Sequence, residues 1–238
     1  MTVVLMLGSA VMALRARAWP KQAFDRVLAI NNAWRLRPDW DAMIHPWDFP
    51  ADRVPQPDAG QRVVTEADFV PAQNAYGGFV YGGGTMAFTA AYWALHALRP
   101  QVIAAFGCDM HYPPGSTHFY GAGTPDPLRN DISLRSLEAK ATRLEVIAAL
   151  QGCAMVNLSD GPSRLTFARV GLDGLRTARP RQFDAAAVAA AVACEASLGY
   201  FAPSGRYWET PDAYDAAKID ALDALWLACA ATAPGLER

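Results

Sequence analysis

The segment spanning residues 85–109 constrains the fold more than any other part of the chain. Residues 85–98 are predominantly apolar, with no glycine or proline among them, and predict a buried helix. After Pro100, the apolar run 101–106 predicts a strand buried on both faces, and residues 107–109 (Gly-Cys-Asp) end it. A helix, a proline, a buried strand and a polar loop in this order are typical of a right-handed crossover between parallel strands.

Similar apolar runs, each closed by glycine or polar residues, recur along the chain. They predict strands at residues 2–7, 26–30, 42–45, 62–65 and 153–157, and helices at residues 11–19 and 133–151, the latter capped by Asp131 or Ser133. This alternation predicts an α/β protein with a Rossmann-like, doubly wound, mostly parallel sheet. We expect strands 3–7, 27–30, 102–106 and 154–156 to be adjacent members of that sheet.

The length of 238 residues fits one α/β domain better than two. We expect residues 1–165 to form a Rossmann-like nucleotide-binding domain, with an excursion at residues 48–80 where prolines interrupt the pattern. Residues 166–238 are expected to form a C-terminal helical extension on the same domain, with helices near 184–198 and 212–231. These two helices could also provide a contact between copies in a homo-oligomer.

Composition excludes several classes of protein. The net charge of −2 disfavours a nucleic-acid partner, and no run approaches the roughly 20 apolar residues of a transmembrane helix. Residues 2–7 are too short for the apolar part of a signal peptide, so we expect a cytoplasmic protein. The four cysteines form no Cys-x-x-Cys pair, which argues against a zinc site or a disulfide framework.

Candidate ligand-binding residues follow from a rule for open parallel sheets, which bind ligands outside the carboxyl ends of their strands. The rule selects Gly8, Ser9, Asn31, Asn32, Gly84, Thr85 and Gly107. The asparagines could either close a turn or read a base or ribose edge, and the glycines before Thr85 could form a turn or admit a phosphate. Neither the dinucleotide glycine fingerprint nor a Gly-Lys-Ser/Thr motif occurs, which disfavours NAD and a P-loop ATPase.

The loop at residues 107–130 is the strongest candidate for chemistry. It has no core periodicity, and it contains the titratable or phenolic side chains of Asp109, His111, Tyr112, His118 and Tyr120. A histidine there can act as general base, and phenolic hydroxyls can stabilise charge on a leaving phosphate. Alternatively, Asp109 caps a turn and the histidines are ordinary surface residues. Long irregular loops in compact domains are usually functional, which favours the first interpretation.

Four short motifs together resemble a known family. Gly-Ser-Ala-Val-Met at residues 8–12, Ile-Asn-Asn at 30–32, Gly-Gly-Thr-Met at 83–86 and Gly-Cys-Asp at 107–109 occur in the order found in bacterial lipooligosaccharide sialyltransferases. The related 6-hydroxymethylpterin diphosphokinase-like proteins share much of this arrangement. The resemblance covers residues 2–158 and fades afterwards.

The resemblance implies a Rossmann-like domain that binds a cytidine nucleotide sugar. Ser9 and Asn31 or Asn32 would face the nucleotide, Gly84 and Thr85 would lie near it, and His111 or Tyr112 would replace a phosphate-contacting tyrosine. The chain departs from the family in two places. Ser9 and residues 11–12 replace an asparagine and a proline-serine pair, and Ala122 stands where the family has its catalytic-base histidine, with His118 matching the histidine before it.

Our leading hypothesis is a glycosyltransferase that uses a nucleotide sugar without a metal or other cofactor. The resemblance points to a CMP-sugar as this donor. His118 or His111 would deprotonate a glycan or small hydroxyl acceptor, and Tyr112 or Tyr120 would stabilise the departing phosphate. One alternative is a diphosphokinase-like phosphoryl transferase, which would need Mg²⁺ and acidic ligands such as Asp109 and Asp126. Another is a non-catalytic nucleotide- or glycan-binding protein that has lost the family base.

Overall fold

The computed structural model of the chain describes residues 1–112, 115, 117–121, 123 and 128–231. In this part of the chain, seven strands form one parallel sheet in the order β4-β3-β2-β1-β5-β6-β7. The strands are β1 Val3–Leu7, β2 Arg26–Ile30, β3 Ala42–Ile44, β4 Arg62–Val64, β5 Val102–Phe106, β6 Ala154–Asn157 and β7 Ala168–Arg169. The fold is therefore α/β and Rossmann-like, as the sequence predicts.

The four expected central strands are adjacent, which confirms that prediction. β1 lies between β2 and β5, with Leu5 paired to Val27 on one side and to Ala104 on the other, and β6 lies beyond β5. All five residues of β1 and all five of β5 are buried. A continuous apolar strand is stable only where helices cover both faces of the sheet, and this explains the position of β1 and β5 at its centre.

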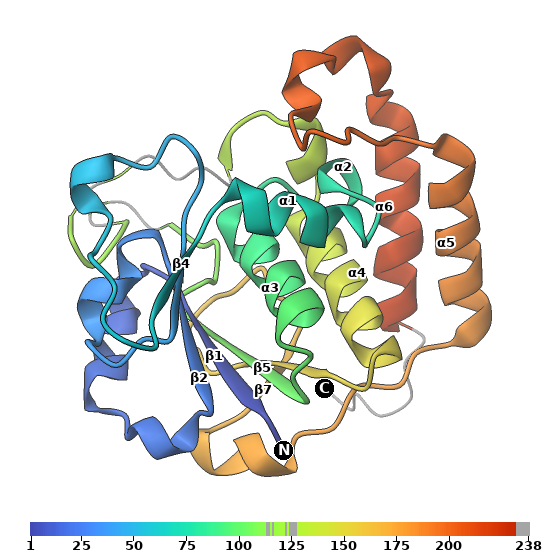
Figure 1. Cartoon of the computed structure of the whole chain (residues 1–238). Coiled ribbons are helices and arrows are strands. Elements are labelled where there is room, and N and C mark those ends of the chain that lie inside the picture. The colour runs from blue at the N-terminus through green and yellow to red at the C-terminus, as the bar shows by residue number, and fades with distance from the viewer. Residues whose placement is uncertain (113–114, 116, 122, 124–127, 232–238) are drawn as a thin grey trace.

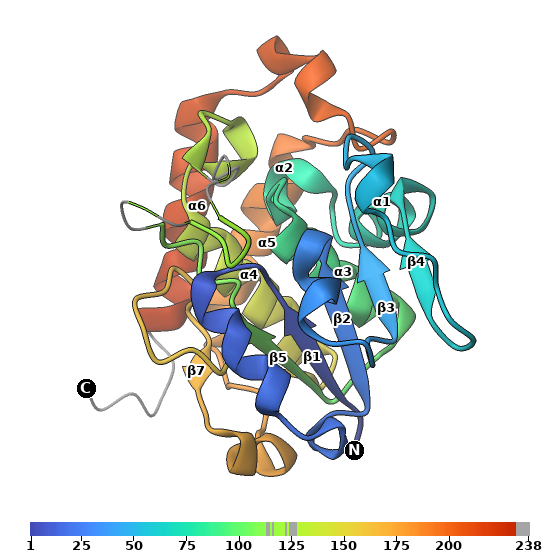
Figure 2. The same cartoon turned by 90° about the vertical axis from the view of Figure 1, so that its left-hand side faces the viewer.

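Helices cover the two faces in different ways (Figures 1 and 2). The α-helices α3 and α4 lie on one face with α1, and short 3-10 helices, including η1, lie on the other. The α-helices are α1 Glu66–Asn74, α2 Phe79–Gly82, α3 Met86–Ala97, α4 Leu137–Leu150, α5 Ala185–Leu198 and α6 Ala216–Ala231. The 3-10 helices are η1 Val11–Ala18, η2 Lys21–Ala23, η3 Asn31–Leu36, η4 Ala51–Arg53, η6 Ile132–Leu134, η7 Leu172–Thr177, η8 Tyr207–Glu209 and η9 Pro211–Ala213.

The helix α6 packs against α4 and α5, so the C-terminal helices form an outer layer (Figure 1). Buried ions contribute to this contact: Lys140 Nζ lies 2.7 Å from Asp223 Oδ1, and Arg143 Nε donates to Glu195 Oε2 over 2.8 Å. No helix in the described part of the chain is both long and apolar enough to cross a membrane.

Several elements differ from the sequence-based expectation. Residues 11–18 form a 3-10 helix, and the helix expected from residue 133 is divided into η6, capped by Asp131, and α4, capped by Ser136. The helix α1 was not expected because Pro71 lies inside it; Asp68 Oδ2 accepts a hydrogen bond from Thr65 N at its start. Within the expected excursion, β4 returns to the sheet edge beside β3, and β7 comes from beyond residue 165.

The winding of the sheet reverses between β1 and β5, and the two strands end in close backbone contact. Gly8 N donates to Phe106 O over 2.8 Å. A Cβ atom on Gly8 would lie only 2.2 Å from the Gly107 carbonyl oxygen, and Gly107 has a φ of +69°, where glycine has no steric penalty. Such a switch point opens a crevice at the carboxyl ends of the strands, where open α/β sheets bind their ligands.

Candidate functional site

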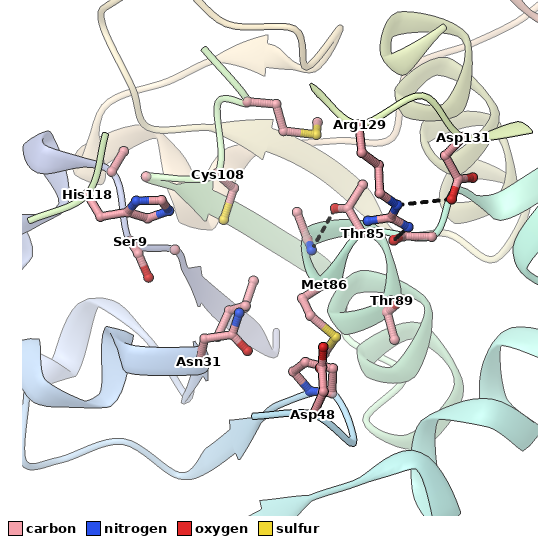
Figure 3. Close-up of a pocket in the computed structure, with 18 of the residues that line it drawn as sticks. Ser9, Asn31, Asp48, Thr85, Met86, Thr89, Cys108, His118, Arg129 and Asp131 are labelled. Carbon is pink, nitrogen blue, oxygen red and sulfur yellow. Dashed lines mark hydrogen bonds and ion pairs between the residues drawn. The ribbon is translucent and has the colours of Figure 1, made fainter. Parts of the chain in front are cut away.

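A pocket of about 640 Å³ lies at this switch point. Its lining comes from the loops after β1, β2, β3 and β5, from the start of α3 and from the C-terminal residues Tyr207 and Trp208. Figure 3 shows Ser9, Asn31 and His118 on one side of this pocket and Arg129 and Asp131 on the other, with Met86, the first residue of α3, between them. The pocket therefore joins segments from most of the length of the chain.

Ten of the expected site residues line this pocket. Six are the strand-end and glycine-loop candidates Gly8, Ser9, Asn31, Gly84, Thr85 and Gly107, and four are the loop candidates His111, Tyr112, His118 and Tyr120. Residues from four separate motifs thus surround one cavity. Ala122 and Asp126, which the sequence also singles out, lie outside the described residues.

Asp109 and Asn32 do not line the pocket. Asp109 is buried, and its carboxylate accepts hydrogen bonds from Asn157 Nδ2 over 3.1 Å and from Ser159 Oγ over 2.6 Å. This carboxylate therefore holds the loop after β6 against the loop after β5. Asn32 is buried within η3.

Asn31 has the backbone conformation expected of a strained functional position. Its φ is +52°, in the left-handed region that asparagine tolerates better than most residues. Its side-chain Oδ1 is buried and has no hydrogen-bond partner among the described residues, and the amide points into the pocket (Figure 3). A buried acceptor without a partner is costly, so this amide is suited to a ligand that brings a donor.

His118 lies within a cluster of aromatic side chains. Its ring stacks on that of Tyr120, with centroids 5.0 Å apart, and lies 6.0 Å from the ring of Tyr112. Its Nδ1 is 2.8 Å from Thr117 Oγ1, and its backbone pairs with Gly121 in a tight turn. Burial lowers the pKa of His118 below its ordinary value. Burial therefore favours the neutral imidazole, which is the form that can accept a proton.

A polar network on the other side of the pocket was missed by the sequence analysis. Arg129 donates to Asp131 Oδ2 over 3.0 Å and to the Gly84 carbonyl over 2.9 Å. The Gly84 N–H donates to Ser133 Oγ over 2.9 Å, and Tyr207 donates to Asp131. Both polar backbone groups of Gly84 are thus held by side chains, which fixes the loop that leads into α3.

Burial and hydrogen bonding oppose each other in this network. Burial raises the pKa of Asp131, but hydrogen bonds from Ser133 and Tyr207 outweigh it and lower the pKa overall. Burial raises the pKa of Tyr207 to about 12. Asp131 is therefore ionised and Tyr207 protonated over the physiological range, which fixes the direction of the hydrogen bond between them.

Two tryptophans line the pocket and remain exposed. Trp47 comes after β3 in the chain and is 60 % exposed. Trp208 lies in η8 and is 48 % exposed. Asp48 lines the same pocket beside Trp47. Sequence patterns did not single out these residues, because Trp47 lies in a proline-rich stretch and Trp208 in a segment that was expected to cover the domain. Among the residues that the structure describes, no group of three or more His, Cys, Asp or Glu side chains is placed to hold a metal ion.

The parallel sheet, its strand order and the pocket at its switch point define the class of this protein: a Rossmann-like α/β protein with a ligand-sized cavity at the strand carboxyl ends. No protein-family model, curated protein or solved structure matches the chain.

Proposed function

We propose that the protein is a glycosyltransferase that uses a nucleotide sugar, with a cytidine nucleotide as the favoured donor. The observation that carries this proposal is the position of His118, an imidazole whose neutral form is favoured by burial, in the same pocket as the strand-end residues Ser9 and Asn31. A base for an acceptor hydroxyl and polar groups for a nucleotide thus share one cavity. The choice of cytidine rests on the resemblance of the four short motifs to the sialyltransferases.

The dimensions and polarity of the pocket support a nucleotide-sized ligand. Its volume of about 640 Å³ lies in the range of roughly 300–1,000 Å³ typical of small-molecule sites. The amide of Asn31 offers a buried acceptor without a partner among the described residues, which suits an amino group on a base. Ser9 lies beside it at the end of β1 (Figure 3).

The proposed transfer requires a base and a means of stabilising the leaving group. His118 takes the proton of the acceptor hydroxyl as its oxygen bonds to the anomeric carbon of the donor sugar, with His111 as the alternative base. The bond from that carbon to the phosphate oxygen breaks, and the nucleotide leaves with the electron pair. Tyr112, Tyr120 and Arg129 line the same pocket and can donate hydrogen bonds to the phosphate.

Nucleotide binding provides the first test. Melting temperatures and calorimetry with CMP, CDP, UDP and ATP, each with and without Mg²⁺, should show CMP as the tightest ligand and no requirement for the metal. Ser9→Ala should weaken CMP binding several-fold, whereas Ser197→Ala, an exposed serine on α5, should leave it unchanged. Binding of ATP with Mg²⁺ alone would instead support the diphosphokinase-like alternative, and the absence of any nucleotide binding would contradict the proposal.

A further inference from the structure

Two exposed indoles stand at the pocket and have no role in nucleotide binding as proposed above. We propose that Trp47 and Trp208, hereafter the indole pair, bind a pyranoside ring of the acceptor, so that the acceptor is a glycan and not a small alcohol. As an acceptor site, the indole pair rests on the proposed function. As a carbohydrate-binding site, it can be tested without a nucleotide.

The indole pair is assembled from two distant parts of the chain. Trp47 follows β3, whereas Trp208 lies in η8, in the C-terminal segment. The guanidinium of Arg206 lies 6.0 Å from the centre of the Trp47 ring, so the two segments meet at the pocket. The ring of Trp208 packs edge-on against Tyr207, whose hydroxyl is held by Asp131. The C-terminal segment is therefore anchored, and Trp208 is held at the pocket.

The exposure of both indoles calls for a ligand. Single apolar side chains are common on protein surfaces, but here two of the largest lie on one cavity, 60 % and 48 % exposed. Each indole offers a broad flat apolar face that water solvates poorly. A ligand with a flat apolar face of its own would cover an indole face and release that water.

The neighbouring charges favour a neutral sugar over an anionic ligand. The carboxylate of Asp48 lines the pocket beside Trp47, and Arg206 is paired with Glu209 at 3.5 Å. A carboxylate repels phosphate but accepts hydrogen bonds from sugar hydroxyls. A pyranose ring has C–H groups on one face and hydroxyls around its edge, so it can stack on an indole while its hydroxyls reach Asp48.

Carbohydrate binding by the full chain, in the absence of nucleotide, tests the indole pair. The probes are methyl glycosides of the common hexopyranoses and their linear oligosaccharides, with sorbitol as a control that has hydroxyls but no ring. Saturation-transfer NMR should show the ring C–H groups of at least one glycoside in contact with the protein, and tryptophan fluorescence should report its affinity. Sorbitol should give neither signal.

Substitution of each indole separates binding at this pair from binding elsewhere. Trp47→Ala and Trp208→Ala should each weaken glycoside binding about tenfold, the effect expected for loss of one aromatic stacking contact. Phe201→Ala is the matched control, because Phe201 is 49 % exposed in the same C-terminal segment but does not line the pocket. The affinity of the Phe201→Ala variant for the glycoside should equal that of the unsubstituted protein. Unchanged melting temperatures would verify that the variants fold.

The outcomes distinguish this inference from the proposed function. If glycosides bind through the indole pair and no nucleotide binds, the carbohydrate site is established and the transferase proposal fails. If CMP binds and no glycoside does, the inference is overturned and the transferase proposal survives. The inference would also be overturned if cytidine bound to the protein and both Trp47→Ala and Trp208→Ala abolished that binding, because the indole pair would then stack a base.

Discussion

The Tyr207 hydroxyl donates a hydrogen bond to Asp131 Oδ2 over 2.8 Å and thereby joins the C-terminal segment to the loop before α4. The Ser133 hydroxyl donates to the other oxygen of this carboxylate, Asp131 Oδ1, over 2.6 Å, and Ser133 Oγ in turn accepts from the Gly84 N–H. A chain of hydrogen bonds therefore runs from the C-terminal segment to the start of α3. The segment that carries Trp208 and the glycine loop of the pocket are held in a fixed relation by this chain.

Tyr207→Phe tests this connection. The substitution keeps the buried ring but removes the donor to an ionised carboxylate, so we expect a loss of about 1.5–3 kcal/mol in the free energy of unfolding. Urea denaturation measures it. Tyr214→Phe is the control, because its hydroxyl has only a 3.4 Å contact with Thr210, and it should change stability by less than about 0.5 kcal/mol. Equal stabilities for the two variants would contradict the prediction.

Gly8→Ala tests the close approach of β1 and β5. A Cβ atom there would meet the Gly107 carbonyl oxygen at 2.2 Å, and a backbone atom in the centre of a sheet cannot move aside cheaply. We expect a loss of about 2–3 kcal/mol in unfolding free energy, with weakened ligand binding in the pocket. Gly161→Ala, where a Cβ meets nothing within 4 Å, should be nearly neutral. A Gly8→Ala protein of normal stability would show that the strands can separate.

Much of the fold could be predicted from the sequence, because buried parallel strands leave a strong local signal. The runs that became β1 and β5 are continuously apolar and are closed by glycine, which predicts strands at the centre of a parallel sheet. The helix α1 left no such signal, since Pro71 interrupts its pattern and tertiary contacts stabilise it. β7 is only two residues long, too short for a sequence pattern, and it is recognised as a strand only by its pairing with β6.

The residues that line the pocket could be predicted where sheet topology determines them and were missed where distant segments contribute them. Ser9, Asn31 and Thr85 follow from the rule that ligands bind at strand carboxyl ends. Asp109 satisfies the same rule, but its carboxylate is used by Asn157 and Ser159, which no local pattern reveals. Tyr207 lies outside the motifs altogether. Its role depends on a contact across the fold to Asp131, and a single sequence does not record such contacts.

Glu145→Gln should alter how stability depends on pH. Burial raises the pKa of Glu145 from its ordinary 4.5 to about 7 in the folded protein. Between these values the folded state binds more protons than the unfolded state, so stability falls as pH rises through that window. Glutamine does not titrate. Between pH 5 and pH 8 the variant should therefore gain on the order of 2 kcal/mol relative to the unsubstituted protein, measured by urea denaturation.

Glu138→Gln on the same helix provides the matched control. A hydrogen bond from Arg164 lowers the pKa of Glu138 below its ordinary value, so this group is ionised in both the folded and the unfolded state from pH 5 upward. The substitution should therefore change stability by the same amount at pH 5 and pH 8. A Glu145→Gln variant that behaved in the same way would show that Glu145 is ionised in the folded protein.

The last prediction concerns His118 as the general base. Removing a general base typically costs about 100-fold or more in rate, and since asparagine keeps a polar side chain, His118→Asn should lower kcat by that factor while CMP affinity stays nearly unchanged. Burial lowers the pKa of His118 from its ordinary value, so the rate of the unsubstituted protein should be constant from neutral pH upward and fall on acidification. The variant should not show this fall in rate at acid pH. His96→Asn, outside the pocket, serves as control and should leave rate and pH profile unchanged.

If His111→Asn alone removed the activity and the fall in rate at acid pH, the base would be His111. Full activity in His118→Asn, in His111→Asn and in the double variant would mean that neither histidine takes the proton.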